Sequence, residues 1–386
     1  MKIIVTCSGG PDSMALLDME RKKGHEIVVC HVNYKRRESA DRDEEIVRSY
    51  CNQYKIKMET LYPEYPGDEN FQAWARKVRY DFFEEVARKQ KIHHIYVAHQ
   101  KDDVIETFFF QKERKMLCDV YGMEKVSKRK EFTIVRPLLK YEKKELEQYC
   151  QDHGISYGID ESNLENHYRR NQIRHSKIDY MDTASKNEVI EDIQNLNEKL
   201  KEAREKAKKK IKEKGLVSLL NEKEAWFYLD LCLPFHTSRK HLNSLVEQLK
   251  HPCLIDLGSY WLERFQNEIR VEKKRKMSSL TFSSVSEMLE NPLFSTKGKI
   301  IQGMNLDPED FPIVVRPVKE GDSIQLRYGQ KKVHRFFIDR KISKIDRMKW
   351  LVVENVDKKV IFVPRIGCDV VHFSTQPNVF MLQCDL

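Results

Sequence analysis

The chain has 386 residues, enough for two or three domains that each bury a core of their own. Hydrophobic residues make up 40% and charged residues 33% of the sequence, a composition typical of a globular protein with a large polar surface. The sequence contains no run of about 18 apolar residues, so we expect no transmembrane helix and no membrane partner. Its N-terminus lacks the long apolar stretch of a signal peptide, so we expect a cytoplasmic protein.

The nine cysteines are scattered and none forms a C-x-x-C pair. This spacing argues against a zinc ribbon or an Fe–S cluster, and the odd count argues against a closed disulfide framework. The net charge is +9, with a pI near 8.9. Such a charge fits a polyanionic partner such as tRNA or DNA, and a lysine-rich proteome would produce the same balance.

Short apolar runs alternate with helical patterns over the first part of the chain. Five strands are expected, at residues 3–7, 26–32, 55–62, 92–99 and 134–135. Helices are expected at residues 13–22, 39–54 and 68–91, the last with an apolar stripe along one face. This order of strands and helices predicts an α/β domain with a doubly wound, parallel, five-stranded sheet.

The rest of the chain changes character twice. Residues 142–153 indicate a helix, residues 156–175 a polar loop, and residues 199–214 a charged helix that ends at Gly215. Apolar helical patterns follow over 216–249, and residues 254–270 have β character. From residue 313 onward, short apolar runs alternate with turns around a helix at 332–338. We expect three domains: 1–180, a mainly helical and charged middle region at 181–300, and a small α+β domain at 301–386.

The most informative motif is a glycine-rich loop between the first strand and the first helix. It consists of Ser8, Gly9, Gly10, Pro11, Asp12 and Ser13. Two glycines let backbone N–H groups turn inward around an anion, and the helix N-terminus adds a partial positive charge. The loop has no lysine after its second glycine and is too short for a Walker A motif. It therefore predicts a nucleotide site that clamps a pyrophosphate and leaves the α-phosphorus open to attack.

This loop resembles the S-G-G-x-D-S motif of the PP-loop, or N-type, ATP pyrophosphatases, which implies the fold of the adenine nucleotide alpha hydrolases. Further motifs resemble those of the tRNA(Ile)-lysidine synthetase family, in that family's order over about the first 175 residues. Tyr34 and Arg36 depart from the family pattern. The matching segments are residues 31–39, Ala75–Arg76 with Arg79–Tyr80, 98–107, 136–139, 160–163 and 168–174, and more loosely 316–322 and 347–350.

The segment after the fourth strand also indicates chemistry on its own. Asp103 and Glu106 are three residues apart, so they share one face of a helix that begins where ligands bind in open parallel sheets. Carboxylates at this place hold Mg²⁺ or accept a proton from an amine, and capping of the helix by Asp102 or Asp103 is the alternative. Arg170 and Arg174 suit a phosphate or a base edge, or belong to a solvated basic face.

The resemblance implies a ligase that uses ATP and Mg²⁺ to join free L-lysine to the wobble cytidine of a CAU-anticodon tRNA(Ile). No obligate protein partner is implied, and we expect a monomer or a homodimer. The expected ATP-binding residues are those of the glycine-rich loop together with His99. The expected catalytic residues are Asn33, Arg37, Asp103 and Asp160. Residues expected to bind the substrate or tRNA are Arg76, Arg79, Glu106, Thr107, Asn163, Arg170, Asn171 and Arg174. Magnesium is expected on Asp102 or Asp103, and residues 199–214 and the C-terminal domain are expected to hold the tRNA backbone.

Two alternatives remain open from the sequence. A PP-loop tRNA thiolase would use the same loop but needs reactive cysteines, and Cys7, Cys30 and Cys118 would have to converge in space. A non-catalytic RNA-binding protein on a decayed ATPase scaffold is the other alternative, although the intact loop and acidic motif argue against it.

Overall fold

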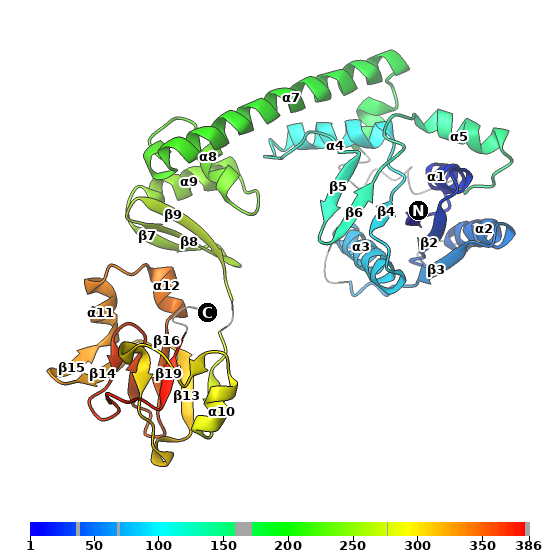
Figure 1. Cartoon of the computed structure of the whole chain (residues 1–386). Coiled ribbons are helices and arrows are strands. Elements are labelled where there is room, and N and C mark those ends of the chain that lie inside the picture. The colour runs from blue at the N-terminus through cyan, green and yellow to red at the C-terminus, as the bar shows by residue number, and fades with distance from the viewer. Residues whose placement is uncertain (36–38, 68–69, 159–171, 276, 383–386) are drawn as a thin grey trace. The chain divides into compact units, whose positions relative to one another are not determined.

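The computed structural model describes residues 1–35, 39–67, 70–158, 172–275 and 277–382 (Figure 1). The chain forms two compact units, Met1–Lys206 and Ala207–Leu386. The expected boundaries near residues 180 and 300 stay a prediction. In the part of the chain that the structure describes, no helix is long and apolar enough to cross a membrane.

The first unit is built on a six-stranded sheet in the order β3-β2-β1-β4-β6-β5. Five of the strands are parallel, which confirms the predicted core of the sheet. The sixth, β5, pairs with β6 in an antiparallel hairpin and was not predicted. Its sequence, Val-Ser-Lys-Arg, has the polar character of an edge strand, so no apolar run marks it. The strand bounds are β1 (Lys2–Thr6), β2 (Glu26–Val32), β3 (Lys57–Leu61), β4 (His94–Tyr96), β5 (Val126–Arg129) and β6 (Phe132–Val135).

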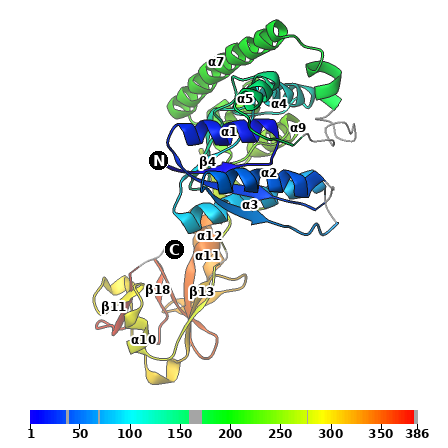
Figure 2. The same cartoon turned by 90° about the vertical axis from the view of Figure 1, so that its right-hand side faces the viewer.

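Helices cover both faces of this sheet because the inner strands are apolar on both sides. Ile3 and Val5 of β1 pack on one face against α1 (Pro11–Lys22), α2 (Ser39–Gln53) and α5 (Lys143–Asp152). Ile4 points to the other face, where α3 (Phe71–Gln90) covers the sheet. Both views show α1 and α2 side by side (Figure 1, Figure 2). The doubly wound arrangement expected from the sequence is confirmed.

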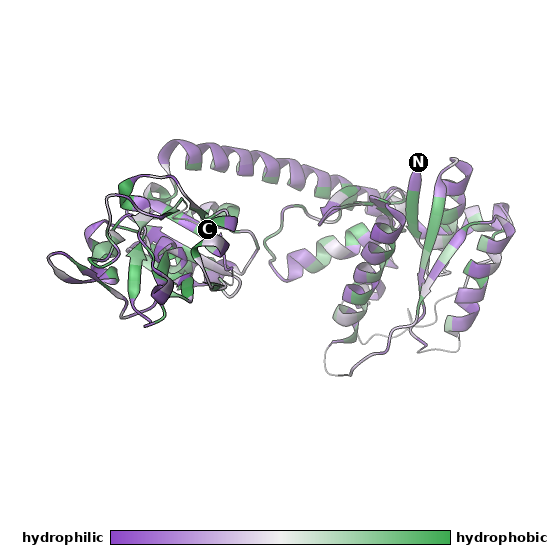
Figure 3. Ribbon diagram, turned by 60° about the horizontal axis from the view of Figure 1, so that its bottom comes forward, coloured by the Kyte–Doolittle hydropathy of each residue, from purple (hydrophilic) through white to green (hydrophobic). Residues whose placement is uncertain are grey.

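A helical layer follows β4 and closes the first unit. Helix α4 (Lys101–Glu113) packs through Val104 and Phe108 against Ile193 of α7 (Thr183–Lys214). On its other side, Ile105 contacts a π-helix, η2 (Arg174–Ile178). The expectation of a loop up to residue 175 was therefore wrong at its end, because the apolar residues Ile173 and Ile178 are buried against α4. Helix α7 is hydrophilic along most of its length (Figure 3), and Gly215 ends it with a φ of +73°.

The second unit begins with helices and ends in small sheets. Helices α8 (Ala225–Cys232) and α9 (Arg239–Leu249) precede an antiparallel sheet of β7 (Cys253–Asp256), β8 (Tyr260–Phe265) and β9 (Glu268–Lys273). A five-stranded antiparallel sheet follows, in the order β10 (Leu280–Phe282), β13 (Ile313–Pro317), β16 (Leu351–Glu354), β17 (Val360–Val363) and β18 (Gly367–Cys368). The smaller elements are α10 (Val285–Glu290), β11 (Phe294–Ser295), β12 (Gly303–Met304), β14 (Ser323–Leu326), β15 (Gly329–Lys332), α11 (Val333–Asp339), α12 (Lys344–Lys349) and β19 (Val379–Met381).

The apolar residues that predicted a helix at 332–338 lie in the hydrophobic core of the second unit. Val333, Phe336 and Phe337 of α11 are all buried, which confirms the helix expected at residues 332–338. Arg316 is buried in β13 and makes ion pairs with Asp322 and Glu354. The segment 316–322 is therefore held to β16 by ion pairs within the second unit.

Candidate active site

The glycine-rich loop turns sharply between β1 and α1, as the sequence predicts. Ser13 Oγ accepts a hydrogen bond from the Ser8 backbone N–H (3.1 Å) and donates one to the Gly10 carbonyl (3.0 Å). These two bonds close the loop on itself. The N-terminus of α1, with Pro11 as its first residue, faces the same turn. The backbone N–H groups of the first helical turn are thereby available to an anion.

Gly9 is required by geometry at this turn. Its φ is +91°, and an added Cβ would lie 2.7 Å from the Asp43 carbonyl oxygen. The Gly9 carbonyl also accepts a hydrogen bond from the Gly158 N–H (2.8 Å), which ties the loop to the segment after α5. A side chain at this position would push the loop away from α2, so only glycine permits this backbone path.

The carboxyl group of Asp12 is largely buried, and one of its oxygens lacks a hydrogen-bond partner among the described residues. Burial raises the pKa of Asp12 to about 7, with a further contribution from the charge of Asp103, while Lys143 and Arg174 act in the opposite direction. The unpartnered oxygen is Oδ1, which is itself buried. A buried carboxylate oxygen without a partner is costly, and a cation supplied by a ligand would satisfy it.

The acidic segment after β4 forms the first turn of α4. Asp103 Oδ2 accepts a hydrogen bond from the Gln100 N–H (2.9 Å), and the Gln100 side chain accepts one from the Asp102 N–H (2.7 Å). Capping by Asp103, the alternative considered from the sequence, is therefore present. It uses only one oxygen of Asp103, so the other remains available to a charged group.

That other oxygen binds a guanidinium. A single terminal nitrogen of Arg174 lies 2.7 Å from Asp103 Oδ1 and 2.8 Å from Glu106 Oε2. Burial alone would lower the pKa of Arg174, but the two carboxylates outweigh it and raise the pKa. The structure thus brings together Asp103, Glu106 and Arg174, three residues that were predicted separately.

Asp102 points to a different cation. Its Oδ1 lies 2.8 Å from Lys186 Nζ, and both side chains are largely buried. Beside this pair, Lys101 Nζ contacts Glu142 Oε1 (3.0 Å) and Asn187 Oδ1 (3.1 Å). The sequence did not indicate Lys186 or Asn187, because they lie in a long charged helix where a lysine usually faces solvent.

His99 lies three residues after the end of β4, in the segment that leads into α4. Burial lowers the pKa of His99 to about 4; Asp103 opposes this effect, while Arg136, Arg76 and Arg79 add to it. Arg136 Nε lies 3.2 Å from His99 Nδ1, so Arg136 belongs to the site although it was not predicted. The signal for Arg136 was its place directly after the fifth parallel strand, at the same edge of the sheet.

Asn33 is buried at the end of β2, and its side chain is fully engaged. The amide nitrogen donates to Asp41 Oδ1 (2.8 Å) and Glu44 Oε2 (2.9 Å), and the oxygen accepts from the Lys35 N–H (2.9 Å). These bonds join β2 to α2, so the Asn33 side chain is held by α2 rather than by the acidic turn of α4. Thr107 lies on α4 with a buried hydroxyl that lacks a partner among the described residues. Arg37, Asp160, Asn163, Arg170 and Asn171 lie outside the described residues.

The Asp12 carboxylate in the phosphate loop fits a magnesium ion that arrives with a nucleotide. No group of three or more His, Cys, Asp or Glu side chains suited to a metal ion occurs in the described ranges. Mg²⁺ bound to phosphates needs only one or two protein carboxylates, so this finding does not conflict with such an ion. Asp12 Oδ1 has neither a hydrogen bond nor a cation beside it among the described residues. Asp102 Oδ1 also lacks a hydrogen bond but lies 2.8 Å from Lys186 Nζ, and Asp103 Oδ1 pairs with Arg174.

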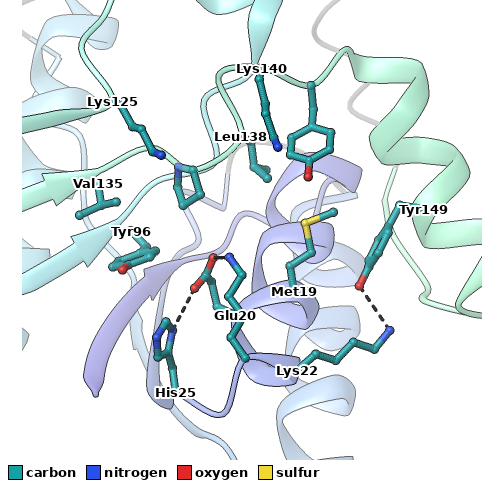
Figure 4. A pocket seen from close by; sticks show the side chains of 13 residues that line it. Met19, Glu20, Lys22, His25, Tyr96, Lys125, Val135, Leu138, Lys140 and Tyr149 are labelled. Atoms are coloured by element: carbon teal, nitrogen blue, oxygen red, sulfur yellow. Dashed lines mark hydrogen bonds and ion pairs between the residues drawn. The ribbon is translucent and has the colours of Figure 1, made fainter.

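A separate cavity of about 670 Å³ lies at the opposite end of α1 (Figure 4). Tyr96, Lys125 and Lys140 line it, together with Glu20 and His25, whose side chains are 2.9 Å apart. No residue of the phosphate loop and no acidic residue of α4 lines this cavity. The candidate active site therefore lies at the carboxyl edge of the sheet, where side chains that follow β1, β4 and β6 meet.

A parallel sheet with this loop at its first strand defines a PP-loop ATP-binding protein. Residues 1–180 match the family model described as a PP-loop domain. The tRNA(Ile)-lysidine synthase of Mycoplasma mycoides is 30% identical over 93% of this chain and 96% of its own length, and that of Mesoplasma florum is 28% identical over 94% and 96%. This chain belongs to the tRNA(Ile)-lysidine synthase family. Among solved structures, the U34-tRNA thiolase NcsA of Methanococcus maripaludis covers 51% of this chain and 73% of its own, with 15% identity and a TM-score of 0.45.

Proposed function

We propose that this protein uses ATP to join free lysine to the 2-carbon of the wobble cytidine in a CAU-anticodon tRNA(Ile). In the first step, the 2-carbonyl oxygen of the base attacks the α-phosphorus of ATP and pyrophosphate leaves. In the second, the ε-amine of lysine attacks the 2-carbon, a proton leaves the amine, and AMP departs. The product, lysidine, reads AUA rather than AUG. Family membership and the paired carboxylates beside the phosphate loop support this proposal.

The phosphate loop accounts for the first step. Its inward-facing N–H groups and the α1 N-terminus stabilise the negative charge that develops on the departing pyrophosphate. Ser8 and Ser13 hold the loop in this shape through the hydrogen bonds between them. Magnesium carried by the nucleotide would sit on the Asp12 carboxylate, where it would neutralise phosphate charge.

The carboxylates Asp103 and Glu106 account for the second substrate. Free lysine carries ammonium groups. Two carboxylates that both accept hydrogen bonds from one ammonium nitrogen would bind such a group. In the structure a guanidinium nitrogen stands in that position, 2.7 Å and 2.8 Å from the two oxygens. Asp103 would also accept the proton that the amine loses, since a carboxylate within hydrogen-bond reach of an amine acts as a general base.

Basic side chains near His99 would bind the tRNA at the carboxyl edge of the six-stranded sheet. Arg76, Arg79 and Arg136 all act electrostatically on His99 and surround it with positive charge. Arginines of this kind bind phosphate oxygens and stack on exposed bases of single-stranded loops. Residues 199–214 of α7 add further lysines for the tRNA backbone.

The cysteines weigh against sulfur transfer. Burial raises the pKa of Cys7 to about 11 and also raises the pKa values of Cys30 and Cys118, which disfavours the reactive thiolate. Cys7 and Cys30 belong to cores on opposite faces of the sheet, so they do not converge. Two of the three cysteines that a thiolase would have to bring together therefore do not share one site.

Transfer of labelled lysine is the direct test of this function. Purified protein, ATP and a CAU-anticodon tRNA(Ile) should yield tRNA that carries the label, and the same tRNA with uridine at the wobble position should stay unlabelled. An unlabelled CAU tRNA, under conditions where the protein binds ATP, would refute the proposal.

A further inference from the structure

Arg174 occupies the place that the proposed function reserves for a substrate cation. One of its terminal nitrogens is shared between Asp103 Oδ1 at 2.7 Å and Glu106 Oε2 at 2.8 Å. A lysine ammonium bound by the same two carboxylates would put its nitrogen at the same point. The two cations cannot be there together, so lysine binding requires Arg174 to leave.

The guanidinium is incompletely satisfied in its present position. A guanidinium has five N–H donors in a planar fork. The Nε of Arg174 is buried and has no hydrogen-bond partner among the described residues. Burying a charged donor without a partner costs free energy. An oxyanion that accepted a hydrogen bond from this Nε would therefore stabilise the guanidinium. Phosphate oxygens are such partners, because they accept two parallel N–H bonds from arginine.

The phosphate loop, which lies within electrostatic range of Arg174, is where the proposed nucleotide would present that oxyanion. Asp12 of the loop responds electrostatically both to Asp103 and to Arg174. Arg174 is also the first residue of the short π-helix η2, a backbone form often found where a helix is adapted to a functional site. The Arg174 side chain thus contacts Asp103 and Glu106 directly and lies within electrostatic range of the phosphate loop.

We infer that Arg174 couples the two binding events by moving between these two positions. Without nucleotide it holds Asp103 and Glu106 together and blocks the lysine site. With ATP bound it turns to the phosphates and releases the carboxylates to the lysine ammonium. Arg174 is thus a positioning residue that favours lysine binding after ATP, an inference that rests on the proposed function for the identity of the cationic substrate.

The size of the effect follows from the equilibrium between the two positions. If Arg174 vacates the carboxylates for only about 1–10% of the time without nucleotide, the apparent affinity for lysine falls about 10- to 100-fold. Because binding coupling is reciprocal, lysine must strengthen nucleotide binding by the same factor. A fixed structural ion pair would behave differently: the lysine affinity of the wild-type protein would not change when nucleotide binds, because Arg174 would stay on the two carboxylates.

The test compares Arg174→Met, which keeps an unbranched apolar stem but removes the guanidinium and its charge, with the wild-type protein. L-lysine binding to the full chain is measured by calorimetry with and without α,β-methylene-ATP, which occupies the nucleotide site without α–β cleavage. Lys177→Met is the matched control, since Lys177 also lies in η2 and pairs with a carboxylate of α4, Glu113, at 3.1 Å. Arg174→Gln serves as the second variant if the methionine variant fails to fold.

We expect Arg174→Met to bind lysine about tenfold more tightly than wild type without nucleotide and to show no response to the ATP analogue. Wild type and Lys177→Met should gain about tenfold in lysine affinity when the analogue is added. Equal or weaker lysine binding by both Arg174 variants, or an unchanged response to the analogue, would overturn the inference. If wild type ligates lysine to tRNA in a parallel assay, such a result refutes only the coupling role. If wild type neither binds nor transfers lysine, the proposed function itself has failed.

Discussion

The ammonium group of Lys186 lies 2.8 Å from Asp102 Oδ1, which ties the first turns of α7 to the first turn of α4. Both side chains are close to nine-tenths buried, so neither charge is well solvated. Because α4 also carries Asp103 and Glu106, this pair fixes the helix that presents the proposed lysine site. The N-terminal part of α7 is therefore a support for the site as well as a connection to the second unit.

Lys186→Met should loosen this support by leaving the Asp102 carboxylate buried without its cation. We expect the free energy of local opening of α4 to fall by about 2 kcal/mol, since removing one partner of a buried ion pair is strongly destabilising. Hydrogen exchange of peptides covering α4 and the start of α7 measures this change. The double variant Lys186→Met/Asp102→Asn should recover most of the loss, because no unpaired charge remains. No recovery in the double variant would show that the pair contributes by packing rather than by charge.

Ser13→Ala should disable the phosphate loop without unfolding the protein. The substitution removes the acceptor for the Ser8 N–H and the donor to the Gly10 carbonyl, so the loop loses its closed shape. We expect the rate of tRNA-dependent pyrophosphate release to fall by about 10²- to 10³-fold, as for the loss of one donor that stabilises developing charge. Ser49→Ala is the control, because Ser49 is an exposed residue of α2 that bonds Glu45. Near wild-type release by the Ser13 variant would remove the loop from the mechanism.

Glu106→Gln should affect lysine and leave adenylation in place. The variant keeps the shape of the side chain but removes one of the two charges around the ammonium position. We expect the KM for lysine to rise about 100-fold, while pyrophosphate release without lysine stays within about threefold of wild type. Glu113→Gln is a matched control on the same helix, where the carboxylate pairs with Lys177. A parallel loss of both activities in Glu106→Gln would mean that this residue serves the nucleotide instead.

The sequence was informative where local rules decide the structure. The apolar runs and the glycine loop predict the five strand segments and the turn at Gly9, because these depend on neighbouring residues. The parallel order follows from the helices between the strands. It could not show that Lys186 would reach Asp102, since this contact joins residues 84 positions apart and depends on how α7 packs. It also missed that Arg174 would fill the space between Asp103 and Glu106, because a motif lists residues without saying which of them touch.

His372 makes the second unit sensitive to alkaline pH. Its imidazole lies between Asp369 (Nδ1 to Oδ1, 2.6 Å) and Asp310 (Nε2 to Oδ1, 2.9 Å). Burial alone would lower the pKa of His372, but the two carboxylates outweigh it and raise the pKa to about 9. Its folded pKa thus lies above the unfolded value near 6.5, so the stabilisation is complete below about pH 6.5 and is lost as the pH rises through 9.

Comparison of wild type with His372→Gln checks this prediction. Hydrogen exchange of peptides around residues 305–312 and 369–382 should show strong protection by the imidazolium at pH 6. The difference between the two proteins should shrink towards zero at pH 10. A constant difference between pH 6 and pH 10 would contradict a role for the charge.

The fate of the α-phosphate tests the central claim most directly. With ATP labelled at the α-phosphorus, a CAU-anticodon tRNA(Ile) and no lysine, we predict that the label accumulates on the tRNA while pyrophosphate is released. Addition of lysine should then release labelled AMP and leave one lysine on each tRNA. Release of orthophosphate in place of pyrophosphate, or a tRNA that never carries the label, would contradict the account.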